Sequence, residues 1–427
     1  MAATLFRNRS VNSRDIKFEL EASVTAYEEE KAAISKLGPK VELPPAAKRL
    51  WRDLELEMIA LEGLYLQATG KDYQRPEAPS AREMKALETF FEAMHGRRWS
   101  DLAGWLGRKA TPNTRGVLPF SCNPWCWAGI ECGIGCVDAL CLSGNQLQGE
   151  LPGAALADIK GLVTLDLSDN ELQGPLPPEL GMLTHLQYLR LAVTKLEGYI
   201  PDTLGMLTGL RELNLSCGRL SGPIPASLGR CTKLSVLNLS HNMLDGGIPP
   251  ELGKLHGLRE LSLAHNQLTG RVPPSFDCLG RLRELSLSRN FLAGTVTPWL
   301  GELTSLKRLL LDHNAFSGIL PPKSVENLSE LEVLHLQFNQ LSGNIPRTLG
   351  MLRELRVVNL CGNRLEGVVP AELGNIRHLV GLELGRNLIT GPLPVSLGKL
   401  TLLVDFHAVG GCLSYSLPLN RGFTRFV

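Results

Sequence analysis

A repeat of 24 residues governs most of this chain and constrains its fold more than any other feature. One unit reads LSVLNLSHNMLDGGIPPELGKLHG and the next reads LRELSLAHNQLTGRVPPSFDCLGR. The interval is 24 residues, except for 25 in the first and eighth units. A single unit cannot bury its own apolar face, so such units stack and share one core. The twelve units begin at Val137, Leu162, Leu186, Leu210, Leu234, Leu258, Leu282, Leu306, Leu331, Leu355, Leu379 and Leu403.

Each unit follows the pattern L-x-x-L-x-L-x-x-N-x-L, which predicts a short strand and then a turn. In the fifth unit Leu237 and Leu239 point inward, whereas Asn238 between them points outward. The amide of Asn242 can satisfy backbone groups that the turn leaves unpaired. Stacked units then form a parallel ladder with about 4.8 Å between neighbouring strands. The pattern therefore predicts an α/β solenoid.

Two neighbouring units lack the turn asparagine and carry Thr194 and Gly218 instead. A threonine hydroxyl reproduces only part of the bonding of an amide, and glycine reproduces none. An unsatisfied buried polar group costs roughly 1–3 kcal/mol. We therefore expect residues 190–222 to be the weakest joint of the stack.

The longer motif L-x-G-x-I-P-x-x-L-G-x-L resembles the signature of plant-type leucine-rich repeat proteins and covers roughly residues 137–418. The resemblance implies a right-handed superhelix of about twelve repeats. It also implies an additional short strand near L-x-G, 3₁₀ turns on the outside, and recognition of a partner on the concave or lateral face.

The segment before the repeats has the features of an end cap. Ser80 and Glu83 form an S-x-x-E capping box that predicts a helix start. Leu87, Phe90, Phe91 and Met94 give this helix an apolar stripe, and Trp99 and Trp105 follow it. The run from Cys126 to Cys132, CWAGIEC, is similar to the cap of plant-type receptors, including algal and protist relatives. The expected organisation is a helical extension over residues 1–79, with an αα-hairpin and a linker, a cap over 80–136, repeats over 137–418 and a tail over 419–427.

Four of the ten cysteines cluster in the cap, at Cys122, Cys126, Cys132 and Cys136. They allow three pairings, and the resemblance to plant-type receptors implies a disulfide between Cys126 and Cys132. A zinc site is the alternative, although the spacing is not the usual C-x₂-C pair. Cys231 stands where other units have a core leucine, so we expect it to be a small buried apolar residue.

Composition narrows the classes of function. The net charge of +1 gives no field that would gather nucleic acid, and no apolar run is long enough to span a membrane. The chain has no visible secretory leader and its other thiols are scattered, so the sequence favours a cytoplasmic protein. An extracellular or plasma-membrane location is the alternative if a first exon is missing.

No catalytic signature is present: the chain lacks GxxxxGK[ST], HExxH and GxSxG motifs. We therefore expect neither an enzyme nor a cofactor. One row of turn residues, in successive repeats, deserves comparison with metal sites or pH switches, although LSHN is also a common variant of this repeat. The row holds His241, His265, Arg289, His313 and Phe338.

The eighth and ninth units differ from the others on their outward face. Leu310 lies between two inward leucines, so it must point outward. We expect His313, His335 and Phe338 to surround it, with Phe291 on the lateral side of the preceding unit. Exposed apolar area of this kind marks a partner surface, although scattered apolar surface residues are also normal. The resulting hypothesis is a non-enzymatic scaffold that recognises a protein or peptide, in signalling or defence; the alternative is a secreted or cell-surface protein of the receptor-like or polygalacturonase-inhibitor-like type.

The chain contains N-x-S sequons that would be used only after secretion. Because LNLS is ordinary strand sequence in this repeat, and sugars there would obstruct the concave face, we expect the strand sequons to be unused. The sequons begin at Asn8, Asn214, Asn238 and Asn327.

Overall fold

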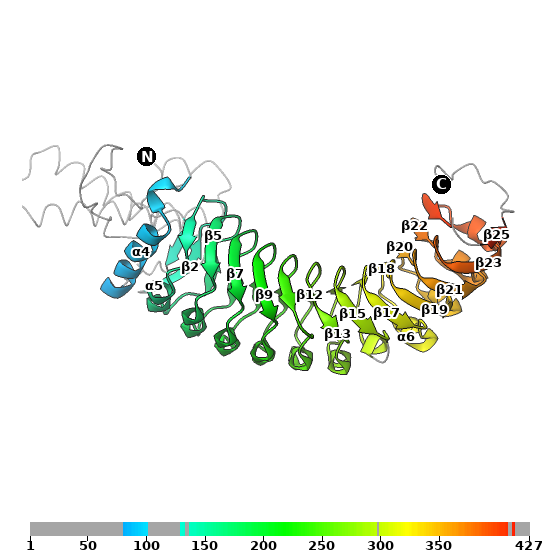
Figure 1. Ribbon diagram of the computed structural model, residues 1–427, viewed down its shortest axis with the longest axis horizontal. Coiled ribbons are helices and arrows are strands. Elements are labelled where there is room, and N and C mark those ends of the chain that lie inside the picture. The colour runs from blue at the N-terminus through cyan, green and yellow to red at the C-terminus, as the bar shows by residue number, and fades with distance from the viewer. Residues whose placement is uncertain (1–79, 101–128, 133–135, 297–298, 409–411, 415–427) are drawn as a thin grey trace, which may run out of the picture.

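The computed structural model describes residues 80–100, 129–132, 136–296, 299–408 and 412–414. The expected hairpin in residues 1–79, Trp105 and the tail at 419–427 lie outside these described residues. The described chain forms an arc, with strands along its inner, concave side and short helical turns along its outer, convex side (Figure 1). The α/β solenoid predicted from the repeat is confirmed.

The concave side is one sheet of 13 strands, of which twelve belong to the repeats. Neighbouring repeat strands are parallel, and their register joins equivalent positions such as Leu237 and Leu261. Leucines at these positions are buried, as the alternating pattern predicts. The repeat strands are β2 (Val137–Cys141), β4 (Thr164–Asp166), β6 (Tyr188–Arg190), β8 (Glu212–Asn214), β10 (Val236–Asn238), β12 (Glu260–Ser262), β14 (Glu284–Ser286), β16 (Arg308–Leu310), β18 (Val333–His335), β20 (Val357–Asn359), β22 (Gly381–Glu383) and β24 (Asp405–His407).

A second set of parallel strands lies at the L-x-G motifs, on the lateral side of the arc. It forms sheets of five and seven strands, which the bridge between Gly247 and Thr269 connects. The additional strand that the plant-type resemblance implied is therefore present. These strands are β3 (Gln148–Glu150), β5 (Glu171–Pro175), β7 (Lys195–Tyr199), β9 (Arg219–Pro223), β11 (Met243–Asp245), β13 (Thr269–Gly270), β15 (Phe291–Gly294), β17 (Ala315–Gly318), β19 (Gln340–Asn344), β21 (Arg364–Gly367), β23 (Leu388–Pro392) and β25 (Cys412–Ser414).

Helical turns form the convex side, and their length follows the length of the repeat. A Cβ atom on Gly205 would lie 2.4 Å from the carbonyl oxygen of Ser227, so the close approach of successive turns requires glycine. The two 25-residue repeats have short α-helices, α5 (Gly153–Asp158) and α6 (Pro322–Glu326). The other repeats have 3₁₀ turns, namely η3 (Pro178–Met182), η4 (Asp202–Met206), η5 (Ala226–Arg230), η6 (Pro250–Lys254), η7 (Pro274–Cys278), η8 (Trp299–Glu302), η9 (Arg347–Met351), η10 (Ala371–Asn375) and η11 (Val395–Lys399).

The turn asparagines join each repeat to the one before it. Asn266 donates through Nδ2 to the carbonyl oxygens of Leu239, Leu263 and Ala264, at 3.0, 3.1 and 3.3 Å. Its Oδ1 accepts the backbone N–H of Leu244 in the preceding repeat at 3.0 Å. Each such side chain therefore satisfies backbone groups of two repeats at once.

This ladder of asparagines is interrupted at the two substituted turns. The Thr194 hydroxyl donates to the carbonyl oxygen of Leu191 in its own repeat, and Gly218 contributes no side chain. Val193 adopts a left-handed backbone with φ of 56°, a conformation that is strained for a β-branched residue. The structure thus shows fewer side-chain bonds and more backbone strain in residues 190–222.

The cap helix closes the N-terminal end of the core. Helix α4 (Ala81–Ala93) begins with the predicted capping box: Ser80 Oγ accepts the N–H of Glu83 at 3.3 Å, and Glu83 Oε2 accepts the N–H of Ser80 at 2.9 Å. Trp99, after the short turn η1 (Gly96–Arg98), packs edge-on against the rings of Phe90 and Phe91. Strand β1 (Ile130–Cys132) pairs antiparallel with β2 and forms the end of the concave sheet.

The structure corrects one of the disulfide candidates. Cys136 has a free thiol, which donates to Asp138 Oδ1 at 3.1 Å, and burial together with this carboxylate raises the pKa of the thiol to about 11. Cys122 and Cys126 lie outside the described residues, as does the side chain of Cys132, so their pairing remains a prediction. Cys231 is fully buried as expected, and burial raises the pKa of its thiol to about 11.

Candidate functional site

The four residues expected on the concave face lie in two adjacent rows of repeats eight and nine. Leu310 and His335 are register partners at the ends of β16 and β18. His313 and Phe338 follow in the turns, with ring centroids 4.6 Å apart. We call these four residues, together with Asp312 and Gln337 between the rows, the concave patch.

Backbone conformation determines how the turn residues of the patch project. Residues directly before the turn asparagine are left-handed along the stack, including His313 (φ 52°) and Phe338 (φ 56°). The next repeat has Gly362 at this position, and a Cβ atom there would lie 2.7 Å from the Phe338 ring. The Phe338 ring therefore sits between His313 and Gly362, and Phe338 remains 40% exposed.

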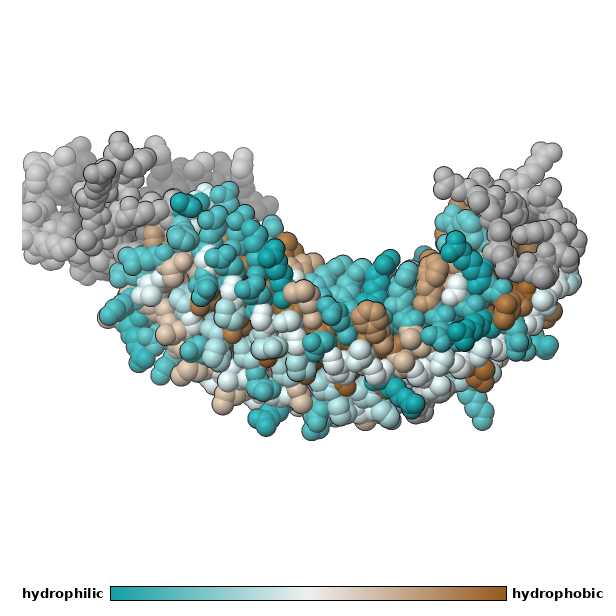
Figure 2. Space-filling model, in the orientation of Figure 1, coloured by the Kyte–Doolittle hydropathy of each residue, from teal (hydrophilic) through white to brown (hydrophobic). Residues whose placement is uncertain are grey.

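Exposure within the patch is less than the sequence predicted. Leu310 is half-buried, although it points away from the core as expected, and His313 and His335 are half-buried too. Figure 2 shows small groups of hydrophobic residues scattered over a largely hydrophilic or neutral surface, with no continuous apolar face in that view. Phe338 is thus the main exposed apolar side chain of the concave patch.

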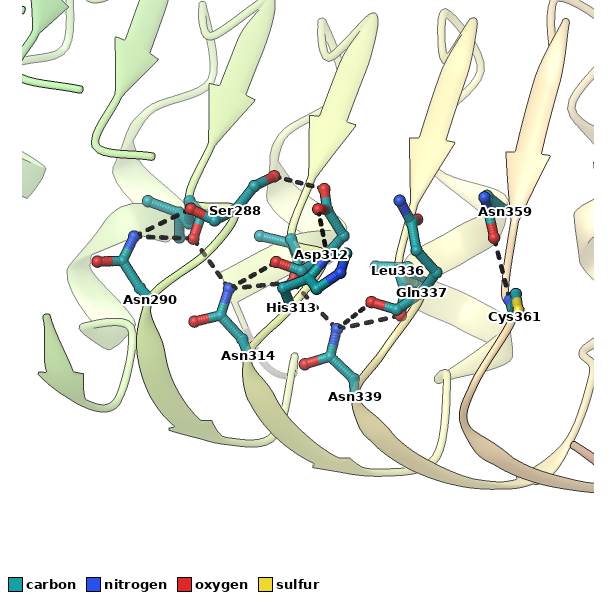
Figure 3. A network of polar contacts seen from close by, with 12 residues as sticks. Ser288, Asn290, Asp312, His313, Asn314, Leu336, Gln337, Asn339, Asn359 and Cys361 are labelled. Atoms are coloured by element: carbon teal, nitrogen blue, oxygen red, sulfur yellow. Dashed lines mark hydrogen bonds and ion pairs between the residues drawn. The ribbon is translucent and has the colours of Figure 1, made fainter. Parts of the chain in front are cut away.

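A buried carboxylate holds the centre of the patch in place (Figure 3). Asp312, whose side chain is 12% exposed, accepts the Ser288 hydroxyl at 2.5 Å and lies 2.9 Å from Nδ1 of His313. A carboxylate only accepts, so Nδ1 of His313 must carry the proton. Because the serine and the histidine both face the carboxylate, they do not form the serine–histidine pair that nucleophilic catalysis requires.

Two further polar groups of the patch are poised by burial. The Gln337 Oε1 atom is buried and has no hydrogen-bond partner among the described residues, so it is an available acceptor. Burial lowers the pKa of His335 below its ordinary value of 6.5, and Arg308 lowers it further, whereas Asp312 and Glu383 act in the opposite direction. His335 is therefore neutral at neutral pH.

Ion pairs run along the edge of the concave patch. Lys307 Nζ lies 3.1 Å from Glu332 Oε1, and Arg308 Nε lies 3.2 Å from Glu284 Oε2. These pairs are exposed enough that each contributes little to stability. They leave the surroundings of the patch with balanced charge rather than a field of one sign.

Phe291 does not belong to the concave patch. It opens strand β15 of the lateral ladder, opposite Thr269, and is 65% exposed. The structure thus places four of the five predicted partner-binding residues together and the fifth on another face.

The histidine row is brought together but forms no metal site. The rings of His241 and His265 stack 4.0 Å apart with an interplanar angle of 16°. No group of three potential ligands for a metal occurs among the described residues. Stacked faces direct the ring nitrogens sideways instead of toward a shared centre, which favours a packing role for this pair.

Sequence reasoning missed the contact between Ser288 and Asp312. The two residues occupy the same position in successive repeats, 24 residues apart. Alignment of the repeats would have shown that Asp312 is a carboxylate in a row that is otherwise mostly serine or alanine. The backbone conformation of the turn row left no comparable signal, because side chains as different as Val193 and Phe338 share it.

Comparison with known proteins agrees with this architecture. The leucine rich repeat family matches residues 208–268 and 246–292, and single leucine rich repeats match residues 161–183, 330–352 and 354–376. The chain is 42% identical over 71 residues to the leucine-rich repeat receptor-like serine/threonine-protein kinase RGI4 of Arabidopsis thaliana, which covers 16% of this chain and 6% of that protein.

Two solved structures extend the similarity. The plant peptide hormone receptor RGFR1, in complex with RGF2, is 37% identical with a TM-score of 0.63, over 64% of this chain and 44% of the receptor. The ectodomain of the Arabidopsis receptor kinase HAESA, in complex with an IDA peptide hormone, is 30% identical with a TM-score of 0.64, over 77% of this chain and 58% of HAESA.

Repeat, fold and relatives together define a leucine-rich repeat solenoid. Within that class, the chain is a leucine-rich repeat protein of the plant type. It spans only 6% of the curated relative's length and about half of each structural relative.

The expectation of a cytoplasmic protein is wrong. The relatives are receptor kinases and an ectodomain, which is the part of a membrane receptor that lies outside the cell. They point to an extracellular or membrane location, and the scattered thiols misled the sequence interpretation. Within the described residues, no helix combines the length and apolar character needed to cross a bilayer.

Proposed function

We propose that this chain is a non-enzymatic recognition scaffold that binds a peptide or protein ligand on its concave face, with the concave patch as a principal contact. The structural relatives RGFR1 and HAESA each hold a peptide hormone. A parallel ladder of short strands offers an extended ligand successive side chains at a regular spacing of about 4.8 Å. Signalling is the process in which such recognition would act.

The observation that carries this proposal is the seating of Phe338. Its left-handed backbone is an uncommon conformation for a bulky residue, and the glycine of the next repeat leaves room for its ring. Strained residues that the surrounding structure holds in place are concentrated at functional sites. An aromatic ring that is fixed by its neighbours and 40% exposed loses little entropy when a ligand packs against it.

The chemistry of the patch supports recognition over catalysis. Ser288 donates to Asp312 instead of to a histidine, so no activated nucleophile is formed. The buried acceptor of Gln337 and the fixed carboxylate of Asp312 suit hydrogen bonds to a ligand's N–H groups.

The proposal is tested with a displayed library of short linear peptides, selected against the full chain. We expect Phe338→Ala combined with Leu310→Ser to weaken the selected peptides by about 1–2 kcal/mol, or roughly 5–30-fold in Kd. The melting temperature should change little, because Phe338 is exposed and Leu310 only half-buried. Titration calorimetry measures Kd, and calorimetric scans measure the melting temperature.

The matched control is Leu388→Ser, which removes an apolar side chain that is 62% exposed on the lateral strand β23. This variant should bind the selected peptides as the parent does. Equal binding by the parent and the double variant would contradict the role of the patch, and failure to select any peptide would contradict a peptide ligand.

A further inference from the structure

The three N-x-S sequons in the described residues occupy very different environments. Asn214 and Asn238 end the concave strands β8 and β10 and are half-buried. Asn327 directly follows helix α6 on the convex side and is exposed, as is Ser329, the third residue of its sequon. Figure 1 shows α6 on the side of the arc opposite the concave sheet.

In the strand sequons, the hydroxyl is already engaged by the asparagine itself. Asn214 Oδ1 accepts the hydroxyl of Ser216 at 2.7 Å, and Asn238 Oδ1 accepts that of Ser240 at 2.7 Å. The same two oxygens also accept the backbone N–H groups of these serines. These bonds fix the four side chains against the sheet surface.

The strand sequons also exclude each other. Asn214 and Asn238 are register partners on neighbouring parallel strands, about 4.8 Å apart. Two oligosaccharides cannot leave the sheet from points this close without overlapping. A sugar on either one would in addition lie over the concave sheet.

The position of Asn327 results from the length of its repeat. The eighth repeat has 25 residues, and its outer turn is the α-helix α6 instead of a 3₁₀ turn. Asn327 is the C-cap of this helix, at the place where η4 and η9 end in the exposed residues Met206 and Met351. The amide therefore stands at the outer rim of the convex side.

We propose that Asn327 is a site of N-linked glycosylation when the chain passes through a secretory pathway, and that Asn214 and Asn238 are not. In the reaction, Nδ2 of Asn327 forms a bond to C1 of the first sugar of a lipid-diphosphate-linked oligosaccharide. The bond from C1 to the diphosphate oxygen breaks, the lipid diphosphate leaves, and the proton lost by Nδ2 is passed to the leaving group or to solvent.

The product is compatible with the folded structure. Nδ2 donates one hydrogen bond, to the carbonyl oxygen of Gly301 at 3.0 Å. A glycosylated amide keeps one N–H, so it can retain this bond while the sugar occupies solvent. The inference rests on the extracellular or membrane location of the relatives and leaves the concave patch uncovered, so it is independent of the proposed ligand site.

The test is secretion of the full chain from plant cells behind a leader peptide, followed by site-resolved mass spectrometry before and after treatment with a peptide-N-glycosidase. Ser329→Ala removes the sequon and leaves the asparagine and its bond to Gly301 intact. Ser329→Thr is the matched control, because it changes the same exposed residue but preserves the sequon. We expect the glycan on Asn327 in the parent and in Ser329→Thr, and its complete loss in Ser329→Ala.

Asn214→Gln and Asn238→Gln should leave the glycan pattern of the secreted protein unchanged. Secreted protein with an unmodified Asn327 would overturn the proposal. Occupancy of Asn214 or Asn238 would overturn its second half, and would also show that surface position does not decide the use of these sequons. The sequon at Asn8 lies outside the described residues and is distinguished by its own peptide.

Discussion

Individual side chains in this solenoid are governed by the repeat position that they occupy. The position before the turn asparagine is left-handed whether it holds His241, Arg289, Phe338 or the β-branched Val193. The fold therefore imposes a conformation that the residue itself does not favour. Such positions can carry functional side chains because their direction is fixed by the backbone of the whole stack.

Protonation of His335 provides a test at the residue scale. Burial holds its pKa below the ordinary value of 6.5, so the folded state binds this proton less readily than the unfolded state. Stability is therefore unaffected above about pH 7 and is lost as the pH falls below about 6.5 and through the lower pKa of the folded state. Hydrogen exchange around β18 should show faster opening near pH 5 than near pH 7, after correction for intrinsic rates.

The variant His335→Asn should remove this part of the pH dependence, because neighbouring repeats carry Asn238 and Asn359 at the same position. The control His378→Asn changes an exposed histidine in an outer turn and should leave the dependence as in the parent. An unchanged pH dependence in His335→Asn would assign the effect to other groups.

At the scale of elements, the turn asparagines explain cohesion better than the strands do. Each strand of the concave sheet spans three residues in most repeats and would be marginal alone. The asparagine adds bonds both to its own repeat and to the preceding one, as Asn290 does with Leu287 and Leu263. Loss of one asparagine therefore weakens a joint between two repeats.

We expect residues 190–222 to open before the rest of the solenoid. Thr194 and Gly218 reduce the side-chain bonding of two consecutive joints, and Val193 adds strain. The missing bonds cost roughly 1–3 kcal/mol at each buried group that is left unsatisfied. Native-state hydrogen exchange should show lower protection there than around Asn266 and Asn290.

Transfer of the substitution provides the matched control. Asn266→Thr should lower protection in its own segment toward that of residues 190–222 and leave distant repeats unchanged. Uniform protection along the parent solenoid, or an Asn266→Thr variant that exchanges like the parent, would contradict this account.

Features set by periodicity could be predicted from the sequence, and features set by neighbouring repeats could not. The inward leucines, the twelve strands and the capping box of Ser80 follow from spacing alone. The half-burial of Leu310 and the contact of Ser288 with Asp312 depend on side chains one repeat away. The two 25-residue repeats were visible in the sequence, but their α-helical turns depend on how the additional residue is accommodated.

At the scale of the whole molecule, the solenoid has one continuous core and two ends. Buried residues form a single cluster from the cap helix to the last repeats. Each repeat touches only its neighbours, so stability propagates along one dimension and the ends open first unless they are covered. At the N-terminal end, α4 and Trp99 provide this cover.

Removal of the cap's central aromatic residue should therefore affect the molecule in order of distance. Trp99 is 4% exposed, packs against Phe90 and Phe91, and donates its Nε1–H to the carbonyl oxygen of Met94 at 2.9 Å. Trp99→Ala should destabilise the cap by about 3–5 kcal/mol and lower hydrogen-exchange protection most in the first repeats, progressively less toward the centre, and not in the last. Phe406→Ala, which empties a buried position in the last repeat strand, should give the mirror image. Equal loss of protection throughout the chain in either variant would show that the solenoid unfolds as one cooperative unit, contrary to nearest-neighbour coupling.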